Sequence, residues 1–155
     1  RSALWGAFSH HTHRSAHLPA WRRDRRADAG IAFTVVSVPR IALAPGYTIS
    51  RVIKGGWQLA GGHGAVEASR AHEDMARFVE AGITTFDCAD IYTGVEELIG
   101  DFVAAQAPGA VQVHTKCVPD LNRLATLAPR ELEALIDRSR KRLRAEALDL
   151  VQFHW

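Results

Sequence analysis

Four ionisable side chains of four different types stand where apolar runs of the sequence end: Asp87, Tyr92, Lys116 and His154. Tyr92 follows Asp87 by five residues, and Lys116 and His154 each come directly after a run with strand character. Any one of these residues alone is commonly a surface or capping group. A set of four, delivered by successive strands to one edge of a fold, indicates a shared site.

These residue types together make a proton donor for an oxygen that gains negative charge. A free tyrosine has a pKa of about 10 and is a weak acid at neutral pH. An ammonium near it, such as that of Lys116, favours the tyrosinate, and the carboxylate of Asp87 would hold that ammonium in place. The imidazole of His154 can donate a hydrogen bond to a carbonyl oxygen. The residues therefore predict carbonyl reduction, with a hydride that a cofactor must supply because no side chain can.

The elements that must position these side chains alternate between strands and helices. Runs of β-branched and aromatic residues predict the strands, and apolar residues at helical spacing predict the helices. The predicted strands cover residues 51–54, 83–86, 111–115 and 148–153, and the predicted helices cover residues 69–81, 94–105 and 129–142. This order implies parallel strands joined by right-handed crossovers, as in a doubly wound sheet or a (β/α) barrel. The polar residues at the strand ends favour the barrel, in which those ends meet at one mouth.

Residues with known positional preferences mark the ends of the predicted helices. Gly82 suits the left-handed conformation that ends a helix, and Pro129 suits the first helical turn. Glu96 and Glu97 fall in the first turn of the second helix, where acids are favoured by the helix dipole. We expect these two glutamates to stabilise the helix and not to act as catalysts.

Three segments resemble the aldo-keto reductase family. Residues 85–100 (TFDCADIYTGVEELIG) resemble its signature, with a catalytic Asp five residues before a catalytic Tyr, whereas Asp90 does not fit that spacing. Residues 114–117 (HTKC) and 148–155 (LDLVQFHW) resemble the segments that carry the family's lysine and histidine. The resemblance covers residues 50–155 and implies a (β/α)8 barrel of the TIM-barrel class. It implies that Asp87, Tyr92, Lys116 and His154 are the catalytic tetrad.

The same resemblance implies the cofactor and the reaction. The family reduces an aldehyde or a ketone to an alcohol with NADPH, which implies a small-molecule carbonyl substrate and Tyr92 as the proton donor. Gly56 and Trp57 follow the first predicted strand, where the family brings its backbone close to the nicotinamide, and Asp87 would lie beside them. The choice between NADPH and NADH, and the identity of the substrate, do not follow from these residues.

The sequence supplies only the first four strands and three helices of an eight-stranded barrel. It does not begin with Met and it ends one residue after His154, so we expect a truncated N-terminal half-barrel over residues 47–155. Its first and last strands would be open edges, through which the piece would self-associate. We expect negligible carbonyl reduction by the isolated chain.

Residues 1–46 differ in composition from the rest and predict a disordered basic leader that precedes the domain. They are rich in Arg, Ala, Ser and His and poor in acids, which is typical of an organelle transit peptide. Translated non-coding sequence would give the same bias, and both interpretations stay open. A group of histidines here indicates biased composition more than a metal site. It comprises His10, His11, His13 and His17.

Composition and charge exclude several other classes of protein. The net charge of +2 comes from the leader, so the basic balance does not indicate nucleic-acid binding. Two cysteines, Cys88 and Cys117, are too few for a disulfide framework and match no zinc spacing, so we expect a reduced pair and no metal. The apolar run at 31–38 is far too short to span a membrane. We expect a soluble protein of the cytoplasm, or of the chloroplast or mitochondrion if the leader is a transit peptide.

Two other functions remain open at this level. One is a non-catalytic remnant or regulatory interaction module, since the aldo-keto reductase barrel also serves as a regulatory subunit of potassium channels. The other is a lyase or isomerase that forms a Schiff base on Lys116. The spacing of Asp87 and Tyr92 argues against the second function, because Schiff-base chemistry does not require it.

Overall fold

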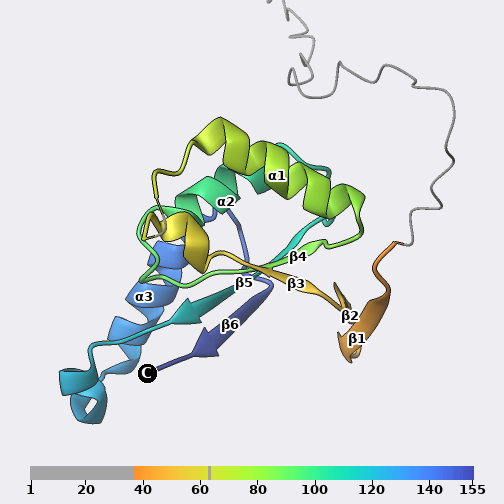
Figure 1. The fold of residues 1–155 in the computed structure, drawn as a ribbon. Coiled ribbons are helices and arrows are strands. Elements are labelled where there is room, and N and C mark those ends of the chain that lie inside the picture. Colours follow the sequence, from red (N-terminus) through yellow and green to blue (C-terminus); the bar gives the residue numbers. More distant parts are fainter. Residues whose placement is uncertain (1–36, 63) are drawn as a thin grey trace, which may run out of the picture. The chain divides into compact units, whose positions relative to one another are not determined.

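The computed structural model of the chain describes residues 37–62 and 64–155 (Figure 1). The strands are β1 (Arg40–Ala44), β2 (Tyr47–Ser50), β3 (Ile53–Gly55), β4 (Thr85–Asp87), β5 (Gln112–Cys117) and β6 (Leu150–Phe153). The α-helices are α1 (Ala68–Glu80), α2 (Val95–Ala104) and α3 (Pro129–Arg142), and two short 3-10 helices cover Trp57–Ala60 and Leu121–Thr126.

Strands β3, β4, β5 and β6 form one parallel sheet in the order of the chain. One helix connects each pair of neighbouring strands: α1 precedes β4, α2 precedes β5 and α3 precedes β6. The predicted α/β class, with four parallel strands and three helices of a TIM-barrel fold, is therefore confirmed. The first strand begins two residues later than predicted and extends to Gly55.

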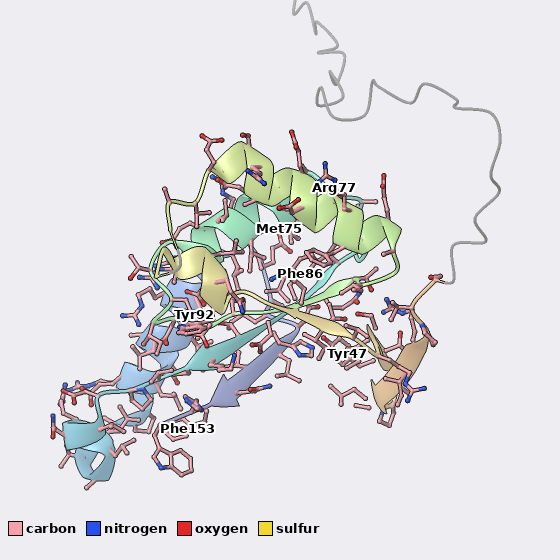
Figure 2. The ribbon with its side chains drawn as sticks, in the orientation of Figure 1. Tyr47, Met75, Arg77, Phe86, Tyr92 and Phe153 are labelled. Atoms are coloured by element: carbon pink, nitrogen blue, oxygen red, sulfur yellow. The ribbon has the colours of Figure 1, made fainter. Side chains whose placement is uncertain are left out.

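The apolar core lies between the helices and one face of the sheet. Phe86 of β4 and Val113 of β5 are buried there, together with Met75 of α1 and Ile99 of α2. Figure 2 places Met75 and Phe86 between α1 and the sheet. Because side chains alternate along a strand, the neighbours of Phe86 and Val113 point to the opposite face. Asp87 of β4 and His114 and Lys116 of β5 lie on that second face, which we call the polar face.

Strands β1 and β2 form an antiparallel hairpin that the sequence analysis did not predict. The predicted boundary of a disordered leader at residue 46 is therefore wrong for residues 40–44, which form β1. The physical reason lies in the turn: Pro45 presets its own backbone angle, and Gly46 adopts a positive φ of 75°. Residues 1–36 of the predicted leader, which include its four histidines and most of the predicted transit peptide, lie outside the described part of the chain.

Polar contacts attach the hairpin to the amino-terminal end of the sheet. The Arg40 guanidinium donates to the Thr84 hydroxyl at 2.5 Å and to the Gln112 side-chain oxygen at 3.0 Å. The Ser50 hydroxyl oxygen accepts hydrogen bonds from the backbone N–H groups of Thr84 (3.2 Å) and Thr85 (3.1 Å). Ser50 of the hairpin thus satisfies two backbone N–H groups at the start of β4.

Both predicted helix-end signals are found. Helix α1 ends at Glu80, and Gly82 has a φ of +86°, the left-handed conformation expected after a helix. Pro129 is the first residue of α3, and the Glu131 carboxylate accepts a hydrogen bond from the Ala128 N–H at 2.9 Å.

The close approach of α2 to the end of α3 depends on Gly100. A Cβ at this position would lie 2.5 Å from the Arg142 carbonyl oxygen and 2.9 Å from the Leu143 backbone. Alanine normally stabilises a helix interior by about 1 kcal/mol relative to glycine. We predict that Gly100→Ala instead lowers the free energy of unfolding by about 2 kcal/mol, because the two backbones must separate.

Urea unfolding of the 155-residue chain measures this effect. The matched control is Gly62→Ala, because Gly62 has no atom within 4 Å of the added Cβ. This control should change stability by less than about 0.5 kcal/mol. A Gly100→Ala variant as stable as the wild type would contradict the packing described for α2 and α3.

Candidate active site

An ion pair between β4 and β5 forms the centre of the polar face. The Lys116 ammonium donates to Asp87 Oδ2 at 2.5 Å and to the Cys88 carbonyl oxygen at 2.9 Å. The Lys116 side chain is 16% exposed and that of Asp87 is 28% exposed, so the pair is largely buried but still accessible to solvent. Two acceptors hold the ammonium in one position at the carboxyl end of the sheet.

Tyr92 lies beside this ion pair. Its ring centre is 5.6 Å from Lys116 Nζ, and the ring packs against the edge of the apolar core (Figure 2). The loop after β4 turns back here, because the Tyr92 N–H donates to the Ala89 carbonyl at 3.0 Å. The structure thus brings Asp87, Lys116 and Tyr92 together, as the sequence predicted for three of the four tetrad residues.

His154 reaches the same end of the sheet through its backbone. Its N–H donates to the Cys117 carbonyl at 3.0 Å, which places it just after β6 and next to the end of β5. Its side chain is exposed at the rim. The structure therefore places His154 at the predicted edge of the sheet through its backbone. Lys116, in contrast, contacts Asp87 and Tyr92 directly through its side chain.

Two glycines, Gly55 at the end of β3 and Gly56 after it, bring the backbone close to Asp87. The Gly56 N–H donates to the Asp87 carbonyl at 2.7 Å, and a Cβ on Gly56 would lie 3.0 Å from that oxygen. A Cβ on Gly55 would meet no atom within 4 Å, so open space lies beside it. Trp57 follows with a side chain that is 56% exposed. The open part of this turn is therefore at Gly55 and Trp57, because Gly56 itself is buried and faces Val95 and Ile99 of α2.

The model of the aldo/keto reductase family matches residues 51–155, more than half of the chain. The chain belongs to the aldo-keto reductase family. A search of the curated proteins found no match. The family match covers the whole parallel sheet but not the hairpin of β1 and β2, and it includes every residue of the predicted tetrad.

Solved aldo-keto reductases share this fold at low sequence identity. A Pseudomonas aeruginosa protein assigned to the family has a TM-score of 0.63 and 19% identity, over 75% of this chain and 47% of its own. The glycerol dehydrogenase of Gluconobacter oxydans has a TM-score of 0.57 and 24% identity, over 79% and 40%. An aldo-keto reductase complexed with NADPH has a TM-score of 0.58 and 21% identity, over 77% and 36%. The chain therefore spans less than half the length of each of these proteins.

A buried carboxylate near Asp87, Tyr92 and Lys116 was not predicted to support this site. Asp90 accepts hydrogen bonds from the Val118 N–H at 3.2 Å and from Arg138 of α3 at 3.1 Å. Burial raises the pKa of Asp90, and these hydrogen bonds and the Arg138 charge oppose that rise. Asp90 thereby attaches the loop that carries Tyr92 to the segment after β5. Sequence spacing excluded Asp90 from the tetrad and gave no sign of this supporting role.

Glu96 does more than stabilise the start of α2. It lies in the first turn of that helix, as predicted, but its carboxylate is also fully buried. It accepts hydrogen bonds from the Thr115 hydroxyl at 2.7 Å and from Arg142 at 3.2 Å. Arg142 also donates to the Asp90 carbonyl at 2.9 Å. The burial of Glu96 could have been predicted from its position one helical turn before Ile99, on the buried side of α2.

The two cysteines are free and buried, as expected for a reduced pair. Burial raises the pKa of the Cys88 thiol to about 12, so this group stays protonated at neutral pH. Within residues 37–62 and 64–155, no group of His, Cys, Asp and Glu is arranged to hold a metal ion. In the same part of the chain, no helix is long and apolar enough to cross a membrane.

His114 lies on the polar face two residues before Lys116 and is only 3% exposed. Its Nε2 is 2.9 Å from the Tyr47 hydroxyl of β2. Burial lowers the pKa of His114 below its ordinary value, although the charges of Asp87 and Asp149 act in the opposite direction. The ring is therefore neutral at physiological pH. It was not among the predicted site residues.

We predict that Arg142→Met lowers the free energy of unfolding by about 3 kcal/mol, because it leaves the buried Glu96 carboxylate without its charged partner. The matched control is Arg140→Met on the same helix. Arg140 pairs with Asp137 at the surface at 3.0 Å, and such pairs contribute only about 0.3–0.5 kcal/mol. Urea unfolding of both variants measures the difference. Equal effects at the two positions would contradict a buried network beneath the Tyr92 loop.

We predict that the stability of the chain falls as the pH drops below the ordinary His pKa of 6.5, in part because of His114. The folded-state pKa is lowered, so the unfolded chain binds the proton first and acid favours unfolding. His114→Gln should therefore lose less stability than the wild type between about pH 7.5 and about pH 5.5, as measured by urea midpoints. An equal loss in the two proteins would show that His114 is not held neutral.

Proposed function

We propose that this chain carries the proton-transfer half of an NADPH-dependent aldo-keto reductase that converts an aldehyde or a ketone to an alcohol. The observation that supports it is the Lys116–Asp87 ion pair placed 5.6 Å from the centre of the Tyr92 ring. Bound NADPH would supply the hydride for the carbonyl carbon. The residues of this chain would act on the carbonyl oxygen.

Tyr92 is the proton donor in this proposal. As the carbonyl oxygen gains negative charge, the Tyr92 hydroxyl donates its proton and becomes a tyrosinate. The Lys116 ammonium stabilises that tyrosinate, and Asp87 keeps the ammonium from turning away. His154, at the end of β6, donates a hydrogen bond that orients the carbonyl oxygen. Each of the four residues thus has one task in a single proton transfer.

The residues after β3 fit the nicotinamide end of the cofactor. The open space at Gly55 leaves room for a flat ring next to Asp87, and Trp57 stands exposed beside it. Gly56 holds the turn against Asp87 through its N–H. We therefore propose Gly56, Trp57 and Asp87 as cofactor-binding residues. The NADPH complex of a family member with the same fold supports this choice of cofactor.

A Schiff-base mechanism on Lys116 is less consistent with these contacts. The nitrogen already donates to the Asp87 carboxylate and to the Cys88 carbonyl, and Schiff-base formation would break both contacts. A Schiff base requires the free amine as the nucleophile. Borohydride treatment in the presence of a carbonyl substrate distinguishes the two mechanisms, because only a lyase of this kind would leave a covalent adduct on Lys116.

The test of the proposed function is a chimaeric barrel, in which residues 51–155 replace the matching half of the NADPH-complexed family member. Oxidation of NADPH with a small aldehyde is followed after circular dichroism has shown that the chimaera is folded. Tyr92→Phe should lower kcat by about 100-fold or more, because the proton donor is lost. Lys141→Met, on the exposed side of α3, is the control and should leave kcat unchanged. A folded chimaera with no activity, or with an active Tyr92→Phe variant, would contradict the proposal.

We predict that the 155-residue chain alone shows no measurable NADPH-dependent reduction of a generic aldehyde. Its residues 37–62 and 64–155 form four of the eight parallel strands that such a barrel needs to close around its mouth. The same photometric assay measures this, with the chimaera as the positive control. Turnover by the purified 155-residue chain would contradict this prediction.

We also propose that the isolated chain self-associates through the open edges of its sheet, β3 and β6. Unpaired edge strands pair readily with other chains, and Ile53 and Phe153 at these edges are 40% and 47% exposed. Light scattering should find dimers or larger species, and Phe153→Lys should shift them toward monomers. A wild-type chain that stays monomeric at all concentrations would contradict this proposal.

A further inference from the structure

The Asp87–Lys116 pair rests on a second layer of polar side chains. Gln112, His114 and Lys116 alternate along β5, so all three face the same side of the sheet. The register pairs His114 with Asp87 on β4 and with Leu150 on β6. His114 is therefore the residue directly across from the carboxylate that holds the lysine.

The ring of His114 is held from the amino-terminal side of the sheet. The Tyr47 hydroxyl lies 2.9 Å from His114 Nε2, and the two ring centres are 6.1 Å apart. Tyr47 belongs to the hairpin, which Arg40 attaches to Thr84 and Gln112. Figure 2 shows Tyr47 where the hairpin faces the sheet, and Tyr92 toward the other end of β5. A chain of polar contacts thus runs from the hairpin to the layer below the ion pair.

The groups that face His114 come from every strand around it. Asp87 of β4 and Asp149, just before β6, bring negative charge, Lys116 of β5 brings positive charge, and Tyr47 of β2 brings a hydroxyl. Because burial keeps the imidazole neutral, it does not compete with Lys116 for the Asp87 carboxylate. It is a rigid, polar and uncharged side chain at the position where a charge would disturb the pair.

We propose that His114 is a positioning residue: its imidazole, fixed by the Tyr47 hydroxyl, supports Asp87 from below and keeps the carboxylate turned toward Lys116. This inference rests on the proposed function only for the catalytic role of the Asp87–Lys116 pair. The contacts themselves involve Asp87, Lys116, His114 and Tyr47, and they do not depend on that function. Removal of the ring would let the Asp87 side chain move or admit water, and the ammonium would lose its fixed partner.

The reactivity of Lys116 toward acetic anhydride tests this inference without cofactor or substrate. In the full 155-residue chain, mass spectrometry follows acetylation of Lys116 and of the exposed Lys141 at a series of pH values. A lysine held in an ion pair reacts slowly, because only the free amine is a nucleophile. We expect His114→Leu to raise the rate for Lys116 by about threefold or more at about pH 8, with no change for Lys141.

Two further variants keep the test decisive if His114→Leu does not fold. Tyr47→Phe removes only the hydroxyl that fixes the ring, and should raise the Lys116 rate by a smaller factor. His114→Gln retains a hydrogen-bonding group toward Tyr47, and should restore most of the wild-type pH profile. A Lys116 profile that is unchanged in His114→Leu, or in Tyr47→Phe if the leucine variant is unfolded, overturns the inference. That result would leave the proposed function untouched, because the chimaera measures reduction independently.

Discussion

The parallel register of β4 and β5 is the constraint on which the site depends. It places Asp87 opposite His114, so that Lys116, two residues further along β5, reaches back to the carboxylate at the carboxyl end of the sheet. A slip of one residue in either strand would turn these side chains into the apolar core. The core on the other face, with Phe86 and Val113, therefore fixes the register that the ion pair requires.

The loop that carries Tyr92 is held by helices rather than by the sheet alone. Arg138 and Arg142 of α3 bind Asp90 and Glu96, and the short distance between α2 and α3 is set by Gly100. Buried charged groups of this kind seldom add much stability compared with apolar residues, but they are costly to break. These pairs fix the loop beside Lys116, where a small displacement would separate Tyr92, the proposed proton donor, from the ammonium.

Residue spacing predicted the side chains that lie at or just after the strand ends, and it missed the contacts between distant segments of the chain. Asp87, Tyr92 and Lys116 were predicted because each stands at a fixed distance from a strand end. The contact of Tyr47 with His114 joins residues 67 positions apart, and no local pattern marks it. The hairpin was missed for a different reason: its Pro45–Gly46 turn lies next to a basic segment whose composition dominated the interpretation.

The most direct measurement of the Asp87–Lys116 unit is a double-mutant cycle on kcat in the chimaeric barrel. Asp87→Asn and Lys116→Met are made singly and together, and reduction of a small aldehyde is followed for all four proteins. If Asp87 acts by holding the Lys116 ammonium, the double variant should be about as slow as the slower single variant, because residues that act as a unit are not additive. Two single effects that multiply in the double variant would contradict this coupling.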